Sequence, residues 1–337
     1  MAKISIIKDR EKIIDIVRAF FKVRGFVEVE TPLLVSAPDP SPYNEVFETS
    51  KVRGKRAFLT PSPEFFMKRL LAQGANNIFQ ICKAFRNPQE LNPFHNPEFT
   101  ILEWYRVNAT YTDLMVDCEN LVSHIFKSLS KQIKSEKLKN SMSYLGKKID
   151  ITLPWPRISV KEAFNKYANV DLDEFMDLKT AKRIAQNKSY KVEKETTWEQ
   201  LYHQIFLNEI EPNFPKDKPL ILFDYPAPLA ALSQIKKTDP RYAERFEFYI
   251  GGVELGNGYS ELTDSKEQKK RLIGDLKERK KLCMKTFPYD RKFVEALKSI
   301  PKTAGIAVGI DRLIMLFTNS ATIQEVLPFP ANDIFTP

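Results

Sequence analysis

Cysteine and histidine are both scarce in this 337-residue chain, which has three of each. The cysteines, Cys82, Cys118 and Cys283, are isolated and odd in number. This pattern argues against a disulfide framework and predicts a reducing, cytoplasmic location. No CxxC pair occurs and the histidines have no paired spacing, so we expect no zinc site.

Long hydrophobic runs are absent as well. No apolar stretch reaches the roughly 18 residues that a membrane-spanning helix needs, and the N-terminal MAKISIIKDREK lacks the apolar core of a signal peptide. Hydrophobic residues make up 43% and charged residues 28% of the chain, as in globular proteins with a large core. The sequence therefore predicts a globular protein without a membrane segment.

The charge balance is basic, with 52 Lys and Arg against 43 Asp and Glu and a net charge of +9. Such a balance suits a nucleic acid, a nucleotide or an acidic protein partner. The excess is concentrated in residues 131–148 and 266–285. We interpret both as solvated surfaces rather than dedicated nucleic-acid patches, because neither interleaves aromatic residues as single-strand binders do.

The stretch FRNPQELNPFHNPEFTILEWY, residues 85–105, joins two predicted strands at residues 78–85 and 98–107 through a proline-rich loop. Alternation along the second strand puts Phe99, Glu103 and Tyr105 on one face, together with Ile101. A carboxylate in such surroundings needs a partner. Arg86 and His95 in the loop could bind phosphate or carboxylate, and Phe99 could stack on a base. An ordinary hairpin with a satisfied salt bridge is the alternative.

The rest of the first half alternates helices and strands. We expect helices at 8–24 and 112–129 and strands at 26–32 and 57–60, with a hairpin around Gly146 and short helices over 159–212. Ser62 can cap a helix that has Pro63 at its first position and ends before Gly74. Glu64 in its first turn is most simply a surface carboxylate favoured by the helix dipole.

Two stretches in the second half carry further charged groups. ERFEFYIGGVELGNGYSELT, residues 244–263, predicts two strands, in which Glu247, Glu254 and Glu261 recur at intervals of seven. Three converging buried carboxylates usually hold a metal or an amine. Thr263 is expected to cap a helix at 264–284. In GIAVGIDRLIMLF, residues 305–317, Arg312 falls in the first turns of a helix, where a bound phosphate would explain a cation.

Together these motifs resemble the class II aminoacyl-tRNA synthetases. GFVEVETP is similar to motif 1, FRN…HNPEFTILEWY to motif 2 and GIAVGIDRL to motif 3. TPSPEFFMKRL and ELGNGYSEL resemble the lysine-specific branch. Because motif 1 lies within the first 30 residues, we expect no N-terminal anticodon-binding domain, which makes the chain similar to the elongation factor P–(R)-β-lysine ligase family. LAALSQIKKTDPRYAERFEFY also looks more like those ligases than like full synthetases.

The resemblance implies an α+β fold: a class II catalytic core over residues 1–337, with an antiparallel β-sheet flanked by helices and a mostly helical insertion at about 131–215. It implies a homodimer formed through motif 1. It also implies ATP and Mg²⁺ as cofactors, lysine as substrate and elongation factor P as acceptor, with transfer RNA a less favoured one. A compact lysyl-tRNA synthetase, a lysine ligase with another acceptor and a non-enzymatic regulatory paralogue are the alternatives.

The family's residue roles transfer as follows. The resemblance implies catalytic roles for Arg86 and Arg312, and magnesium binding by Glu247 and Glu254. The residues implied for ATP binding are Arg86, Asn87, Pro88, His95, Asn96, Phe99, Glu254, Leu255, Gly309 and Arg312. Those implied for the lysine pocket are Ser62, Pro63, Glu64, Glu103, Tyr105, Asn257, Tyr259 and Glu261.

The sequence departs from the family pattern in three places. Arg86-Asn87-Pro88 stands where the family has Arg-Asn-Glu, in a loop one residue longer, so Glu90 could supply the missing carboxylate. Gly256 and Ser260 replace the alanine and histidine found in many β-lysine ligases. Both replacements resemble the pocket of an α-lysine synthetase, so the lysine isomer stays open.

Overall fold

A mixed eight-stranded sheet forms the centre of the computed structural model, which describes residues 4–42, 44–87, 92–133 and 140–335. The pairs β1–β5 and β9–β10 at the two edges are parallel, and all other neighbours are antiparallel. In sheet order the strands are β1 (Val27–Glu28), β5 (Ile78–Phe85), β6 (Glu98–Val107), β13 (Thr303–Gly309), β12 (Val253–Ser260), β11 (Tyr242–Ile250), β10 (Leu220–Pro226) and β9 (Arg157–Ser159).

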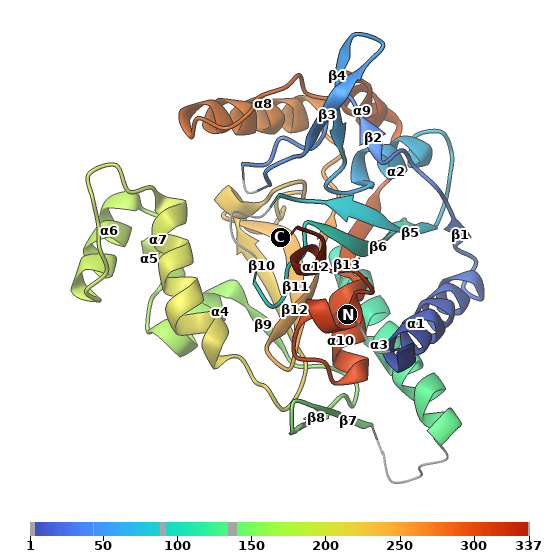
Figure 1. The fold of residues 1–337 in the computed structure, drawn as a ribbon. Coiled ribbons are helices and arrows are strands. Elements are labelled where there is room, and N and C mark those ends of the chain that lie inside the picture. Colours follow the sequence, from blue (N-terminus) through green and yellow to red (C-terminus); the bar gives the residue numbers. More distant parts are fainter. Residues whose placement is uncertain (1–3, 43, 88–91, 134–139, 336–337) are drawn as a thin grey trace.

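One face of this sheet is covered by three helices, α1 (Ile4–Lys22), α3 (Tyr111–Ile133) and α10 (Ile310–Thr318) (Figure 1). Phe21 of α1 stacks on Phe79 of β5 at 4.9 Å and touches Trp104 of β6. Because side chains alternate along β6, Leu102 and Trp104 enter this core while Glu103 faces the opposite side. The helices therefore bury one face and leave the other for polar groups.

Two lobes flank that opposite face. The upper lobe in Figure 1 has a three-stranded sheet of β2 (Leu34–Val35), β4 (Lys55–Leu59) and β3 (Glu48–Val52), with helices α2 (Glu64–Leu71), α8 (Ser265–Lys281) and α9 (Arg291–Ala296). Phe65 of α2 stacks on Phe293 of α9 at 4.0 Å, in a small core that also contains Tyr105 of β6. This packing fixes α2 against the end of the sheet.

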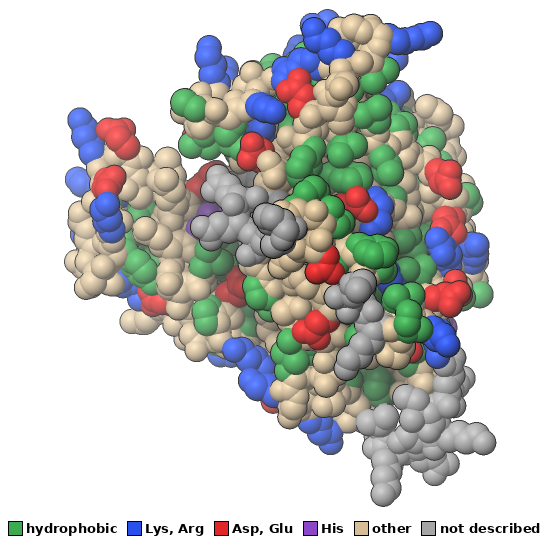
Figure 2. All heavy atoms as spheres, viewed as in Figure 1, with side chains coloured by type: hydrophobic (Ala, Val, Ile, Leu, Met, Phe, Trp, Pro, Cys, Tyr) green, Lys and Arg blue, Asp and Glu red, His purple; other side chains and the backbone are tan. Residues whose placement is uncertain are grey.

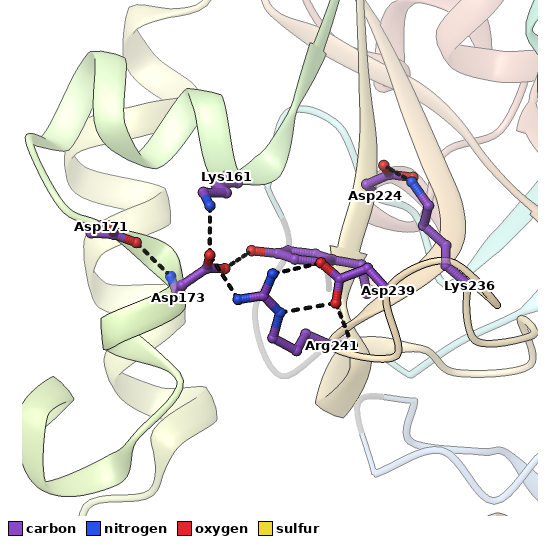
Figure 3. A network of polar contacts seen from close by, with 8 residues as sticks. Lys161, Asp171, Asp173, Asp224, Lys236, Asp239 and Arg241 are labelled. Atoms are coloured by element: carbon purple, nitrogen blue, oxygen red, sulfur yellow. Dashed lines mark hydrogen bonds and ion pairs between the residues drawn. The ribbon is translucent and has the colours of Figure 1, made fainter.

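The second lobe is helical, with α4 (Val160–Ala168), α5 (Leu172–Phe175), α6 (Leu178–Asn187) and α7 (Trp198–Ile205) packed around a core that they share with β10. A polar network ties it to the loop before β11 (Figure 3). Asp173 accepts from Lys161 at 2.5 Å and from Tyr242 at 2.5 Å, and it pairs with Arg241 at 2.8 Å. Asp239 also holds Arg241. The lobe is thus anchored to the main sheet by both apolar and charged contacts.

The remaining elements complete the framework. A hairpin of β7 (Ser141–Tyr144) and β8 (Lys147–Asp150) turns at Gly146, as expected. β9 belongs to the main sheet, so the insertion expected at 131–215 is less uniformly helical than predicted. A π-helical segment, Phe206–Ile210, and three single-turn 3₁₀ helices, Glu211–Asn213, Ala227–Leu229 and Leu297–Ser299, join the larger elements. Two short helices, α11 (Ile323–Val326) and α12 (Ala331–Phe335), follow α10.

The predicted α+β fold is confirmed, with small differences at the element ends. β1 is two residues long rather than seven, and Asp264 rather than Thr263 caps α8 by accepting from two backbone N–H groups. The helix predicted from Pro63 begins at Glu64, whose N–H donates to Ser62 Oγ at 3.0 Å. Within the described residues, none of the helices combines the length and the apolar character that crossing a membrane requires.

Candidate active site

The strand register assembles polar residues in two rows across the face of the sheet that lies opposite helices α1, α3 and α10. Neighbouring strands place Glu103 opposite Ala307, Ala307 opposite Asn257, and Asn257 opposite Glu247. The next row runs through Tyr105, Gly305, Tyr259 and Arg245. β13 contributes only the small residues Ala307 and Gly305 to the two rows.

Gly305 is required by this arrangement. A Cβ atom at this position would lie 2.2 Å from the Tyr105 ring and 2.4 Å from Glu261 Oε1, distances too short for any side chain. Glycine therefore allows the tyrosine and the carboxylate to approach each other over the floor of the site.

Glu103 is the buried carboxylate on the floor, as the alternation of β6 predicted. Its oxygens accept from Ser62 Oγ at 2.6 Å and from Tyr105 Oη at 3.2 Å. Burial raises the pKa of Glu103 to about 8, and the nearby charge of Glu64 adds to that rise. A cation entering the pocket would favour the ionised form.

Lys68 of α2 bridges two more carboxylates of the pocket. Its Nζ lies 2.5 Å from Glu64 Oε1 and 2.5 Å from Glu261 Oε2, and its side chain is 1% exposed. Burial alone would lower the pKa of Lys68, but Glu261 and Glu64 raise it above its ordinary value. Neither oxygen of Glu261 accepts a hydrogen bond of good geometry, so this carboxylate keeps capacity for another donor.

The pocket carries more negative than positive charge when its groups are ionised. Glu64, Glu103 and Glu261 face the single ammonium of Lys68, and burial raises the pKa of Glu261 to about 8 against the opposing effect of Lys68. Because buried charges are stable only when paired, the arrangement can take up a further ammonium group. Sequence reasoning missed Lys68, although its i,i+4 spacing from Glu64 on a predicted helix was a usable signal.

A small cavity opens beside Glu64 toward the loop that precedes β3. It is lined by Val35, Ala37, Pro38, Asp39, Thr60, Ser62, Glu64, Phe65 and Phe66. Burial raises the pKa of Asp39 to about 7, with Glu64 the next contributor. Nothing in the proline- and serine-rich sequence of this loop pointed to Asp39.

The opposite end of the face carries the arginines and aromatics predicted for a nucleotide. The Arg86 guanidinium lies 5.3 Å from the centre of the Phe99 ring, and its Nε donates to the Pro61 carbonyl at 3.4 Å. Gly309, at the end of β13, lies beside Arg312, because a Cβ there would be in ordinary contact with the Arg312 side chain at 3.6 Å.

Arg312 is held at the start of α10 by several contacts. It donates to the carbonyl oxygens of Glu254 at 2.8 Å and Phe94 at 3.2 Å, and to His95 Nε2 at 2.9 Å. Because arginine only donates, Nε2 is the acceptor and Nδ1–H donates to Asn92 Oδ1 at 2.7 Å. Burial, with Arg312 and Arg86 nearby, lowers the pKa of His95 to about 4. The histidine is therefore neutral at pH 7.

Asp311 fixes the helix turn that presents Arg312. It is buried, pairs with Arg10 of α1 at 2.5 Å and accepts from the Thr100 N–H at 2.7 Å. These contacts join α1, β6 and α10 at one point. An anion could then bind here, because the helix dipole at the N-terminus of α10 and the charge of the Arg312 guanidinium would both attract it.

The three carboxylates spaced by seven do not converge, so that prediction is wrong. Glu247 accepts from Arg245 at 2.7 Å and Tyr249 at 2.6 Å, Glu254 lies 3.5 Å from Arg312, and Glu261 pairs with Lys68. The irregularity in the β11–β12 register, where Phe248 pairs with Gly256 and Tyr249 with Glu254, leaves Glu254 on the face opposite Val253 and Leu255. The part of the chain that the structure describes contains no group of three or more Asp, Glu, His or Cys residues fit to hold a metal.

Two of these carboxylates, Glu247 and Glu254, could still bind magnesium. Burial raises the pKa of Glu254, and the charge of Glu247 adds to the rise, so the two groups repel each other without a shared cation. Mg²⁺ commonly uses one or two carboxylates and completes its shell with water and phosphate oxygens. Glu254 and Glu247 fit that donor set.

Comparison with known proteins agrees with the motifs. Residues 2–333 match the family of tRNA synthetases class II (D, K and N). The chain belongs to this family. It is 36% identical over 332 residues to an elongation factor P–(R)-β-lysine ligase of Buchnera aphidicola subsp. Acyrthosiphon pisum (strain APS), covering 96% of this chain and 94% of that protein. It is 36% identical over 337 residues to the ligase of that name from Avibacterium paragallinarum, covering 97% and 96%.

Full synthetases are related over part of their length. The chain is 34% identical over 326 residues to a lysine–tRNA ligase of Erwinia tasmaniensis, a match that covers 96% of this chain and 62% of that protein. The recognised similarity to the lysine-specific class II synthetases is therefore confirmed.

Several residues that the synthetase motifs implied for ATP also have contacts within the chain. The Asn96 side chain donates to the Glu98 carbonyl at 2.6 Å and accepts from the Ala331 N–H at 2.9 Å, which holds α12. Leu255 packs its side chain in the helix-side core. Asn87 is exposed, and its backbone N–H donates to the Glu45 carbonyl at 2.9 Å. Pro88 and Glu90 lie outside the described residues.

The two departures that suggested an α-lysine pocket face away from it. A Cβ atom on Gly256 would lie 2.7 Å from the Ala307 carbonyl oxygen and 2.7 Å from the Phe248 ring. Ser260 is buried and accepts from the Tyr111 N–H at 3.0 Å. Both positions lie on the helix side of β12. They can affect the lysine pocket only by changing where the β12 backbone lies.

Proposed function

We propose that this synthetase homologue is an ATP-dependent lysine ligase that activates α- or β-lysine as an adenylate and transfers it to a lysine side chain of elongation factor P. The observation that carries the proposal is a buried pocket with surplus carboxylates next to an anion site built around two arginines. The names of the relatives support it. We place the reaction in the cytoplasm, as the unpaired cysteines predict.

The substrate's two ends match the two ends of the site. An ammonium group binds among Glu64, Glu103 and Glu261, with Tyr105 beside it and with Ser62, Pro63, Asn257 and Tyr259 lining the path. The carboxylate then points toward Arg86. Phe99 stacks on adenine, and Arg312 with neutral His95 binds the outer phosphates.

Activation needs little proton transfer. A carboxylate oxygen of lysine attacks the α-phosphorus of ATP, the bond to the β-phosphate oxygen breaks, and pyrophosphate leaves. The carboxylate is already ionised at neutral pH, so no base is required. Arg86 stabilises charge on the α-phosphate oxygens, and Arg312 stabilises the departing pyrophosphate. Magnesium held by Glu254 and Glu247 would supply charge neutralisation.

Transfer completes the cycle. The amine of an acceptor lysine attacks the carbonyl carbon of the adenylate, AMP leaves, and the amine loses a proton as the amide forms. The site needs to supply mainly orientation at this stage. A compact lysyl-tRNA synthetase would differ only in having a ribose hydroxyl as the attacking group.

The acceptor can be decided in a single reaction. We expect radiolabelled lysine, offered with ATP and both acceptors, to label elongation factor P and not transfer RNA. Gel separation followed by mass spectrometry of the modified peptide measures the outcome. Label on transfer RNA alone would replace the ligase by the compact synthetase. Adenylate without label on either acceptor would mean that the acceptor is a different molecule.

We also propose a homodimer formed through α1 and β1. β1 is an edge strand of the main sheet, and its Val27 is 61% exposed, as is Val23 just after α1 at 76%. An apolar sheet edge of this kind is stabilised by pairing. Light scattering at micromolar concentration should give about 78 kDa for two 39.0 kDa chains, and Val27→Lys should shift it toward one chain. A wild-type mass of one chain would contradict the proposal.

A further inference from the structure

Helix α8 carries an exposed face made of lysines. With about 100° between successive residues of an α-helix, its exposed lysines fall within an arc of about 120°. They are Lys266, Lys269, Lys270, Lys277, Lys280 and Lys281, which we call the lysine face. Only its edges touch acidic residues, where Glu278 pairs with Lys281 at 2.8 Å and Glu267 lies 3.8 Å from Lys270.

The opposite side of α8 is bound to the rim of the active site. Arg271 donates to the carbonyl oxygens of Ala231 and Ser233, both at 2.8 Å. Ser233 in turn pairs with Glu261 of the lysine pocket through a β-bridge. The buried Arg279 donates to the carbonyl oxygens of residues 41 and 44 at 3.0 and 2.8 Å, in the loop beside the Asp39 cavity.

These contacts place the lysine face at the edge of the pocket. α8 begins four residues after Glu261 and runs for 17 residues, or about 25 Å. Its inner side holds two rim loops, so its lysine face points outward from the same rim. A macromolecule bound there would have its own surface next to the site where the adenylate forms.

The basic surface continues beyond the helix. Lys285 follows α8, and Lys51, Arg53 and Lys55 are exposed on the β3–β4 hairpin. The hairpin is joined to the end of α8 by Arg56, which donates to the Thr286 carbonyl at 2.7 Å. Figure 1 shows α8 and the hairpin together at the top of the molecule, and Figure 2 shows blue Lys and Arg side chains gathered along this end.

We propose that the lysine face of α8 is the docking surface for an acidic protein acceptor, an inference that rests on the proposed ligase function. Six cations on one exposed face attract a partner of opposite charge and orient its approach. An acidic protein fits better than a nucleic acid for two reasons. α8 has no aromatic residue to stack on bases. The lysine face also has no arginine, the residue that matches phosphate with a planar fork.

The test compares two variants with the same change in charge. In the first, Lys266, Lys270 and Lys277 are replaced by glutamate. In the matched control, the exposed residues Lys179, Arg183 and Lys194 of the helical lobe are replaced by glutamate. Transfer of radiolabelled lysine to purified elongation factor P is measured as a function of acceptor concentration and salt, and lysine-dependent pyrophosphate exchange is measured in parallel.

We expect the α8 variant to raise the KM for elongation factor P by about tenfold or more and to flatten its salt dependence. Pyrophosphate exchange should stay within about twofold of wild type, because no lysine of this face touches the pocket. The control should change the acceptor KM by less than about threefold. An unchanged KM in the α8 variant, or equal effects in both variants, would overturn the docking surface. Wild-type protein without pyrophosphate exchange would instead refute the proposed function.

Discussion

Replacing Arg312 by alanine should lower lysine-dependent pyrophosphate exchange by about 100-fold or more. Removing one preorganised group that stabilises transition-state charge costs about 2.7–4 kcal/mol in comparable sites. Arg312 is held by Glu254, Phe94 and His95, so its guanidinium is already ordered before substrate binds. Arg86→Ala should give a loss of similar size, because this arginine lies beside Phe99 where the α-phosphate is expected.

The controls separate chemistry from folding. Arg183→Ala, at an exposed position of α6, should leave exchange unchanged. Arg312→Lys should recover part of the loss, since it restores charge without the planar fork. His95, whose pKa is lowered to about 4, should contribute no titration of exchange between pH 5 and 8. Exchange near the wild-type rate in Arg312→Ala would refute the anion site.

The floor of the site could be predicted from sequence because it depends on local alternation. β6 is a regular strand from Glu98 to Val107, so its period of two decides which side chains face the helices. Trp104 and Leu102 had to enter the core, which left Glu103 and Tyr105 on the other face. Strong β-propensity and the absence of a bulge in the β5–β6 pairing made this prediction safe.

Sequence spacing did not predict the contacts of the carboxylates where the backbone is irregular or where the partner residue is distant in the sequence. Seven is an odd interval, so a regular strand would put Glu254 and Glu261 on opposite faces, and the register shift between Phe248 and Tyr249 changes that alternation. Each carboxylate instead gained a cation from elsewhere in the chain. Of these, only Arg245, two residues from Glu247, was near in sequence, whereas Lys68 comes from another lobe.

Comparison with family patterns carried a different risk. Gly256 and Ser260 differ from the ligase pattern within a motif whose other residues line the pocket. A difference in such a motif is easily interpreted as a change in substrate specificity. Alternation along β12 puts both on the helix side, where Ser260 holds the start of α3 through the Tyr111 N–H. The choice between α- and β-lysine therefore depends on groups that face the pocket. Two of these groups, Glu64 and Asp39, line the small cavity described above.

Replacing Lys68 by methionine should raise the KM for lysine about tenfold or more while changing the KM for ATP by less than about twofold. In the wild type, Lys68 opposes the effect of burial on the pKa of Glu261. The pKa of Glu261 is already about 8 with Lys68 in place. Without the ammonium this pKa rises further, so ionising the carboxylate to pair with the substrate ammonium costs more free energy at neutral pH. Lysine binding in the variant should then recover as pH increases.

The stability of the same variant should change with pH in the opposite direction. A carboxylate whose pKa is raised in the folded state contributes stability below its unfolded pKa and loses it as pH rises through the folded value. Lys68→Met should therefore unfold more readily above pH 8 than at pH 6, while its lysine affinity improves. Pyrophosphate exchange and thermal unfolding across pH 6–9 measure both trends.

Adding Glu261→Gln to Lys68→Met should remove the part of both pH trends that Glu261 causes, and should leave only the part that comes from Glu103, whose pKa is also raised to about 8. The double variant should also be more stable than Lys68→Met at high pH, since no unpaired buried charge is left. Glu103 faces the same space and stays in place, so the pH dependence of the double variant measures what remains when Glu261 no longer titrates. If the KM for lysine in Lys68→Met were independent of pH, or rose with pH, Lys68 would have no part in keeping Glu261 ionised for the substrate.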